Sequence, residues 1–112
     1  MRPFRFVVFK ADGCKSGHDV MMSDPPTRHE VSSVVEKHLD GGRPEHVRIT
    51  KRDGSRGDMF IDDMATLTEQ PRNEAATRIF RAAFLALHPS YDPERMPYIS
   101  GPAVVFDEHV WH

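Results

Sequence analysis

Apolar and polar residues follow each other along this chain in a pattern that predicts four strands. Residues Phe4 to Phe9 are aromatic and β-branched on both faces, which is typical of a strand covered on both sides. Residues 45–50 alternate polar and apolar, and residues 57–62 return after Asp53-Gly54, a two-residue hairpin signal. A last strand is expected from Ile99 to about Phe106.

Two helices are predicted from their caps and from their apolar periodicity. Thr27 and Glu30 have the spacing of a capping box, and valines at helical spacing lead from there to Gly41-Gly42, which should end the helix. Asn73 is a suitable N-cap for the second helix. The apolar residues of this second helix recur at helical spacing and are expected to face the core: Ala76, Ile79, Phe80, Ala83, Phe84 and Leu87.

The predicted elements indicate one α+β domain that spans residues 1–112. Their order is β-α-β-β-α-β, which predicts a mainly antiparallel sheet with both helices on one face. A ferredoxin-like arrangement is the first hypothesis, although other α+β sandwiches share this order. The run from Ala11 to Pro26 is expected to be a long loop.

The composition is that of an ordinary globular domain and narrows the function only slightly. The net charge is −2 and the pI is about 6.4, so we expect no general attraction to nucleic acid or to an anionic membrane. No apolar run approaches the roughly 20 residues of a membrane span, and the run from Phe6 to Phe9 is too short for a secretory signal. A single cysteine, Cys14, cannot form an internal disulfide, so a cytoplasmic location is expected.

Two spaced signatures occupy the second half of the chain. The first is DDMATLTEQPRNEA over residues 62–75, and the second is Ile99-Ser100-Gly101 before the apolar run AVVF. Together they resemble a family of small phage- and plasmid-associated proteins known only as a domain of unknown function. The resemblance implies a phage or mobile-element origin and carries no activity with it.

The residues of the first signature also have a structural interpretation. Asp62-Asp63 should end a strand, Leu67 should hold the turn against the core, and Asn73 should cap the helix. The chain departs from the resembled family at Ala65, where that family has glycine, and at Gln70, where it has an apolar residue.

One set of side chains has ligand types that suit zinc. Cys14 and His18 form a C-x3-H pair, and His109 and His112 form an H-x2-H pair. The two pairs come together only if the first and last strands are neighbours. Because seven histidines are scattered over the chain, we favour surface histidines over a zinc site or a metal-dependent enzyme.

A second set of side chains has the charge to follow a phosphate backbone. The cations of the first hairpin are Arg43, Arg48, Lys51, Arg52 and Arg56. Such a hairpin is an alternative nucleic-acid surface. Aromatic residues do not interleave with these cations but carboxylates do, which favours a solvated hairpin.

The sequence therefore predicts a non-catalytic binding or accessory protein that acts through protein–protein contacts. No catalytic residues and no cofactor are expected, because no arrangement of nucleophile, base and orienting group emerges. Nucleic-acid binding by the hairpin and zinc binding are the two alternatives. Trp111 near the end of the chain suits a core contact or a homodimer contact.

Overall fold

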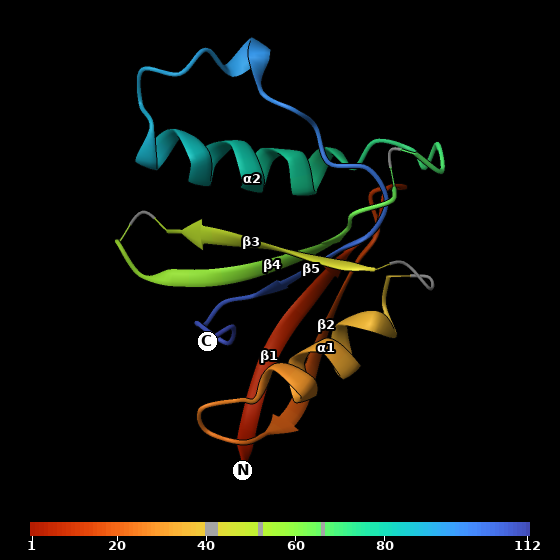
Figure 1. The fold of residues 1–112 in the computed structure, drawn as a ribbon, viewed down its shortest axis with the longest axis vertical. Helices are drawn as coiled ribbons and strands as arrows, with labels where there is room; N and C mark the ends of the chain where they lie inside the picture. Colours follow the sequence, from red (N-terminus) through yellow and green to blue (C-terminus); the bar gives the residue numbers. More distant parts are fainter. Residues whose placement is uncertain (40–42, 52, 66) are drawn as a thin grey trace.

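The computed structural model describes residues 1–39, 43–51, 53–65 and 67–112 (Figure 1). Gly41-Gly42 and Arg52 lie outside these residues. The described elements are β1 (Arg2–Phe9), β2 (Lys15–Met22), α1 (Arg28–Glu36), β3 (Pro44–Thr50), β4 (Arg56–Asp62), α2 (Glu74–Leu87), the 3₁₀ helix η1 (Pro93–Arg95) and β5 (Ala103–Phe106). The α+β class is confirmed, and the element order has one strand more than the sequence predicts.

All five strands form one antiparallel sheet in the order β2-β1-β5-β4-β3. The last strand is the central one, with Phe106 opposite Phe6 of β1 and Val104 opposite Phe60 of β4. A ferredoxin-like sheet would place β1 beside both β4 and β5, but here β5 separates β1 from β4. The ferredoxin-like strand order is therefore corrected by the structure.

Strand β2 lies where the sequence predicts a loop. A tight turn joins it to β1: the Lys10 amide donates to the Cys14 carbonyl oxygen (2.8 Å), and Gly13 adopts a φ of +93°. The Asp12 side chain accepts from the Cys14 amide (2.9 Å) and closes the turn. The prediction fails because β2 is an edge strand with mostly exposed side chains, so its sequence lacks the apolar alternation of a half-buried strand.

The two helices cover opposite faces of the sheet, which corrects the prediction that they share one face (Figure 1). Val31 and Val35 of α1 pack with Phe60, whereas Ala76 and Ala83 of α2 pack with Met59. Neighbouring residues of one strand thus belong to different core clusters. Two layers are needed because the central strands are apolar on both faces, and each face must be covered.

Helix α1 begins with the predicted capping box. The Thr27 hydroxyl accepts from the Glu30 amide (3.1 Å), and the Glu30 carboxylate accepts from the Thr27 amide (3.0 Å). The second Glu30 oxygen accepts from the Ser23 amide (3.0 Å). Hydrogen bonds from the Thr27 and Ser23 amides lower the pKa of Glu30 to about 2.

Glu30→Gln should reduce the sensitivity of the fold to acid. Because the folded state lowers the pKa of Glu30 from 4.5 to about 2, the ionised carboxylate stabilises the fold above pH 4.5. That advantage over the variant should shrink as the pH falls through this interval. Urea unfolding of both proteins at a series of pH values measures it. A difference in stability that stays constant from neutral pH to pH 2 would contradict this role.

Helix α2 begins at Asn73, as predicted, and rests on the sheet through small residues. The Asn73 side chain accepts from the Ala76 amide (3.1 Å). Ala76, Thr77 and Ala83 are the buried residues of the helix, while Phe80 is only half-buried. Leu87, expected in the core, is 55% exposed. Ile79 and Phe80 pack against the core cluster of Ala76 and Ala83 but remain partly exposed.

Candidate functional site

The two sequence signatures meet at a buried polar junction at the N-terminus of α2. Asn73 is fully buried, and its Nδ2 donates to the carbonyl oxygens of Phe9 (2.9 Å) and Gly101 (2.8 Å). The Thr77 hydroxyl donates to the Asn73 carbonyl oxygen (2.7 Å) and accepts from the Ile99 amide (2.9 Å). These bonds join α2 to the end of β1 and to the segment before β5, so the junction is structural.

The acidic pair of the first signature, Asp62-Asp63, lies where β4 ends and the turn begins, as predicted. Asp62 accepts from the Met64 amide (2.9 Å) and from the Gln70 side chain (2.9 Å). A Cβ atom on Gly101 would come within 2.5 Å of Gln70 Oε1, and the φ of Gly101 is +74°, so glycine is required there. Leu67 does not hold the turn, because it is 75% exposed; Ala65 is buried instead.

The four candidate zinc ligands do not form a site. Across the described residues, no three His, Cys, Asp or Glu side chains are placed to hold one metal ion. Strands β1 and β5 are neighbours, as the site would need, but His18 lies on β2, opposite Phe6 on the far side of β1 from β5. There it stacks on Phe6 (5.1 Å between ring centroids).

The two pairs of candidate ligands also have other surroundings. Cys14 is exposed in the turn before β2. His109 and His112 stack on each other with ring centroids 4.2 Å apart. The structure therefore does not bring these four side chains together, and His18, His109 and His112 take part in separate local contacts.

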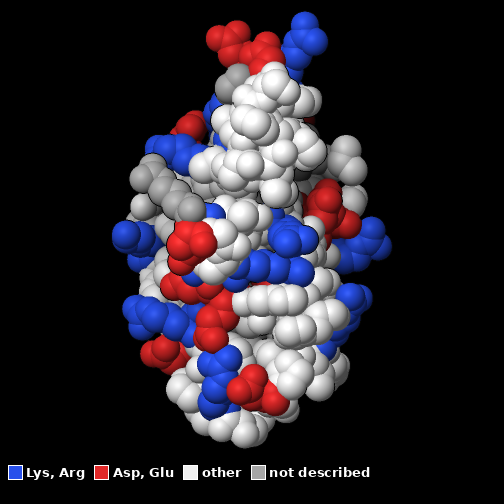
Figure 2. Space-filling model, turned by 90° about the vertical axis from the view of Figure 1, so that its left-hand side faces the viewer, with Lys and Arg blue, Asp and Glu red and all other residues white. Residues whose placement is uncertain are grey.

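The cations of the first hairpin are largely paired with acids. Arg43 binds Asp63 (3.0 Å), and Lys51 donates to the carbonyl oxygen of Asp107 and lies 3.9 Å from its carboxylate. Arg56 binds Asp58 (3.1 Å), and Arg48 is exposed. The face drawn in Figure 2 shows basic and acidic residues interleaved rather than a basic stripe. This arrangement favours the solvated hairpin over a phosphate-binding surface.

Asp58, an acidic residue of this hairpin, is the most deeply buried charged side chain among the described residues. Asp58 is fully buried, and its Oδ1 accepts from His46 Nε2 (2.6 Å) and from Arg56. Its Oδ2 accepts from the amides of Val110 (2.7 Å) and Trp111 (3.0 Å). Burial opposes ionisation, but the hydrogen bonds outweigh it and lower the pKa of Asp58.

Asp58 anchors the last residues of the chain to the sheet. The Trp111 ring stacks on His46 (5.7 Å between centroids) and meets Phe60 edge-on (5.3 Å). The guanidinium of Arg28, from α1, lies over the Trp111 ring at 4.8 Å from its centroid. Both carboxylate oxygens of Asp58 are taken up by these structural bonds. The His46–Asp58 pair therefore holds the tail rather than serving as a base for catalysis.

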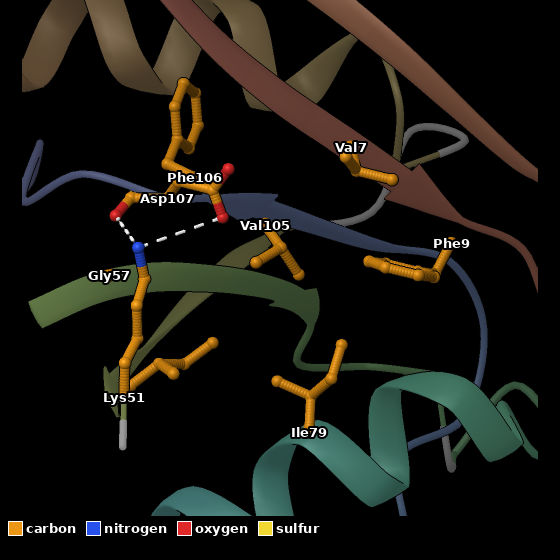
Figure 3. A pocket seen from close by; sticks show the side chains of 9 residues that line it. Val7, Phe9, Lys51, Gly57, Ile79, Val105, Phe106 and Asp107 are labelled. Carbon is orange, nitrogen blue, oxygen red and sulfur yellow. Dashed lines mark hydrogen bonds and ion pairs between the residues drawn. The ribbon is translucent and has the colours of Figure 1, made fainter. Parts of the chain in front are cut away.

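A groove lined mainly by apolar residues lies beside α2, on the side of the helix that carries Ile79. Its first hollow, of about 280 Å³, lies among Val7, Phe9, Val105 and Ile79, whose side chains point towards one another (Figure 3). Lys51 and Asp107 form its rim. Residues that line either hollow and define what we call the α2 groove are Val7, Phe9, Ile49, Lys51, Ile79, Ala82, Ala86 and Val105.

The second hollow of the α2 groove has a volume of about 310 Å³. It lies between β3 and α2, where Ala82 and Ala86 are exposed, and it shares Ile49, Lys51 and Ile79 with the first. Sequence reasoning misses this groove because it assigns Ile79 and Ala83 to the core and gives Ala82 and Ala86 no role. The small side chains of Ala82 and Ala86 are a weak signal that space is left beside the helix.

Comparisons of the chain with protein-family models, with curated proteins and with solved structures gave no match. Among the described residues, no helix has both the length and the apolar character needed to cross a membrane. The candidate site is thus defined by its own geometry.

Proposed function

We propose that this chain is a non-catalytic binding protein that holds an apolar peptide segment of a partner protein in the α2 groove. The observation that carries the proposal is the pair of adjacent hollows on one side of α2, which are lined mainly by apolar residues and share Ile49 and Ile79. Burial of such surface against a partner is the main source of binding free energy.

A peptide fits the α2 groove better than a small molecule does. Each hollow, at about 280 and 310 Å³, is at the lower limit of small-ligand sites, which span roughly 300–1,000 Å³. Two shallow hollows side by side instead suit successive apolar side chains of one segment, as in grooves that bind amphipathic helices or extended peptides.

The charged groups beside the α2 groove favour binding over chemistry. Lys51 at the rim donates to the Asp107 carbonyl oxygen, so its ammonium group already has a partner.

The resemblance of residues 62–75 to phage and plasmid proteins supports an accessory role in a mobile element, with a cytoplasmic setting as part of the same proposal. A gene position within a metabolic operon, away from phage or plasmid genes, would contradict that origin.

Peptide display against the whole protein tests the groove. Selected peptides should carry closely spaced apolar residues, and binding should fall about tenfold or more in Ala82→Glu and Val7→Glu, which place a charge in one hollow each. Leu87→Glu is the matched control: Leu87 is an exposed apolar residue of α2 that lines neither hollow. Binding to this control should be unchanged.

The outcome that rejects the proposal is equally specific. Peptides that bind the two groove variants as tightly as the parent protein place recognition elsewhere. Equal losses in all three variants would assign binding to the exposed apolar end of α2. Circular dichroism of each variant separates loss of binding from loss of fold.

A further inference from the structure

Within the described residues, strand β2 pairs only with β1, and its other edge is open. In the β1–β2 pair, residues whose numbers add to 24 face each other. The Lys10 amide bonds to the Cys14 carbonyl oxygen, so every second residue of β2, counted from Cys14, directs its backbone N–H and C=O groups towards β1. By this alternation, the backbone groups of Lys15, Gly17 and Asp19 point away from β1. Such an edge is a template for another strand.

The opposite edge of the sheet, strand β3, is interrupted at its first residue. The Lys51 amide bonds to the Ser55 carbonyl oxygen, so the odd-numbered residues of β3 direct their backbone groups towards β4. The even-numbered residues direct theirs outward, and Pro44 is one of them. Proline has no amide hydrogen and interrupts pairing there. Strand β2 carries no proline between Lys15 and Met22, so its edge is uninterrupted.

The sequence of β2 is self-complementary about Gly17, and we propose that two copies of this chain pair through antiparallel β2 strands with Gly17 on the two-fold axis. In that register Lys15 of each copy lies opposite Asp19 of the other, on the α2 face of the sheet. Ser16 of each copy then lies opposite His18 of the other, on the α1 face. Two charge pairs thus form from one strand. Ser16 and His18 already hydrogen-bond within each copy (2.9 Å), so the two polar pairs meet as one cluster on the α1 face.

Local geometry at Gly17 suits a two-fold axis. An axis brings a residue against itself, and glycine has no side chain to collide there. The Arg5 guanidinium lies over Gly17, since a Cβ atom would come within 2.6 Å of Arg5 Nη2, and Arg5 Nη1 is 3.6 Å from Asp19. Asp19 would therefore lie between Arg5 of its own copy and Lys15 of the other.

The β2 contact is separate from the proposed function. The α2 groove is lined by β1, β3, β4, β5 and α2, and no residue of β2 contributes to it. Pairing through β2 would give a ten-stranded sheet and leave both grooves open. Failure of the dimer would not affect the groove, and failure of peptide binding would not affect the dimer.

Sedimentation equilibrium over a concentration series tests the pairing. Lys15→Glu puts like charges opposite each other twice per dimer, so the dimer dissociation constant should rise about tenfold or more. Asp19→Lys should weaken the dimer as well. The double exchange Lys15→Glu with Asp19→Lys should restore part of the lost affinity, because the new lysine still lies beside Arg5 of its own copy. Arg48→Glu, a charge reversal on the β3 edge, is the control and should have no effect.

The native cysteine measures the register without a mutation. In the proposed register, Cys14 of one copy lies opposite Val20 of the other. Val20 is six residues along the strand from the second Cys14, so the two cysteines of a dimer should be about 20 Å apart. A nitroxide on Cys14 reports this separation by electron spin resonance.

Three outcomes would overturn the inference: a monomer throughout the series, a Cys14 separation far from this value, or no rescue by the charge exchange. A monomer that pairs only when a partner protein is present would make β2 an edge for a foreign strand.

Discussion

Replacing Asp58 with alanine should lower the free energy of unfolding by about 3–5 kcal/mol, the range for removing one partner of a buried ion pair. Asp58 is fully buried, and the change leaves His46, Arg56 and the amides of Val110 and Trp111 without their acceptor. Chemical unfolding in urea measures the loss. A loss of this size would be a large share of the 5–15 kcal/mol typical of a whole domain.

The single tryptophan supplies a second readout for Asp58→Ala. If Asp58 anchors the tail, the Trp111 ring should leave His46 and Phe60, and its fluorescence should shift to longer wavelength before global unfolding. Asp53→Ala is the matched control, because Asp53 is an exposed carboxylate of the same hairpin that bonds only to Ser55 within the described residues. A loss no larger than that of the control would contradict the anchor.

Asn73→Ala should also cost about 3–5 kcal/mol, far more than the loss of a helix cap alone. The cap accounts for about 1 kcal/mol. The remainder arises because two carbonyl oxygens lose their donor: the buried oxygen of Gly101, at about 1–3 kcal/mol, and the partly buried oxygen of Phe9, at about 1 kcal/mol. Thermal unfolding monitored by circular dichroism measures the effect.

Thr27→Ala is the matched control for Asn73→Ala. Thr27 caps α1 from an exposed position, so its replacement should remove little more than a cap. Equal losses in the two variants would mean that Asn73 is a cap and nothing more, and that the signature junction does not hold α2 to β1 and β5.

Short sequence patterns were enough to predict the helix caps and the hairpin. The capping box at Thr27, the cap at Asn73 and the hairpin at Asp53-Gly54 all appear in the structure where the pattern places them. Each depends on residues within a few positions of one another.

The rest of the fold depends on contacts between distant segments. Strand β2 is exposed, so pairing with β1 rather than an apolar pattern makes it a strand. The helices take opposite faces because the central strands are apolar on both faces. The central place of β5 in the sheet is a pairing that element order does not encode. The helix periodicity of α2 predicts a helix but not how closely it approaches the sheet.

The candidate site shows the same division. Asp58 looks like a solvated hairpin acid until Val110 and Trp111, more than 50 residues away, bring their amides to it. One local signal was present: in β4 Asp58 shares a face with Phe60, and a carboxylate on an apolar face needs partners. The α2 groove left a weaker signal, since alanines such as Ala82 and Ala86 fit a tightly packed helix equally well.

Chemical-shift mapping with a display-selected peptide tests the proposed binding site most directly. In methyl spectra of the whole protein, the peptide should shift the signals of Val7, Ile79 and Val105, which line the α2 groove. Val31 and Val35, buried under α1 on the other face, should be unaffected. Shifts confined to the α1 face, or to β2 alone, would contradict the assignment of peptide binding to the α2 groove.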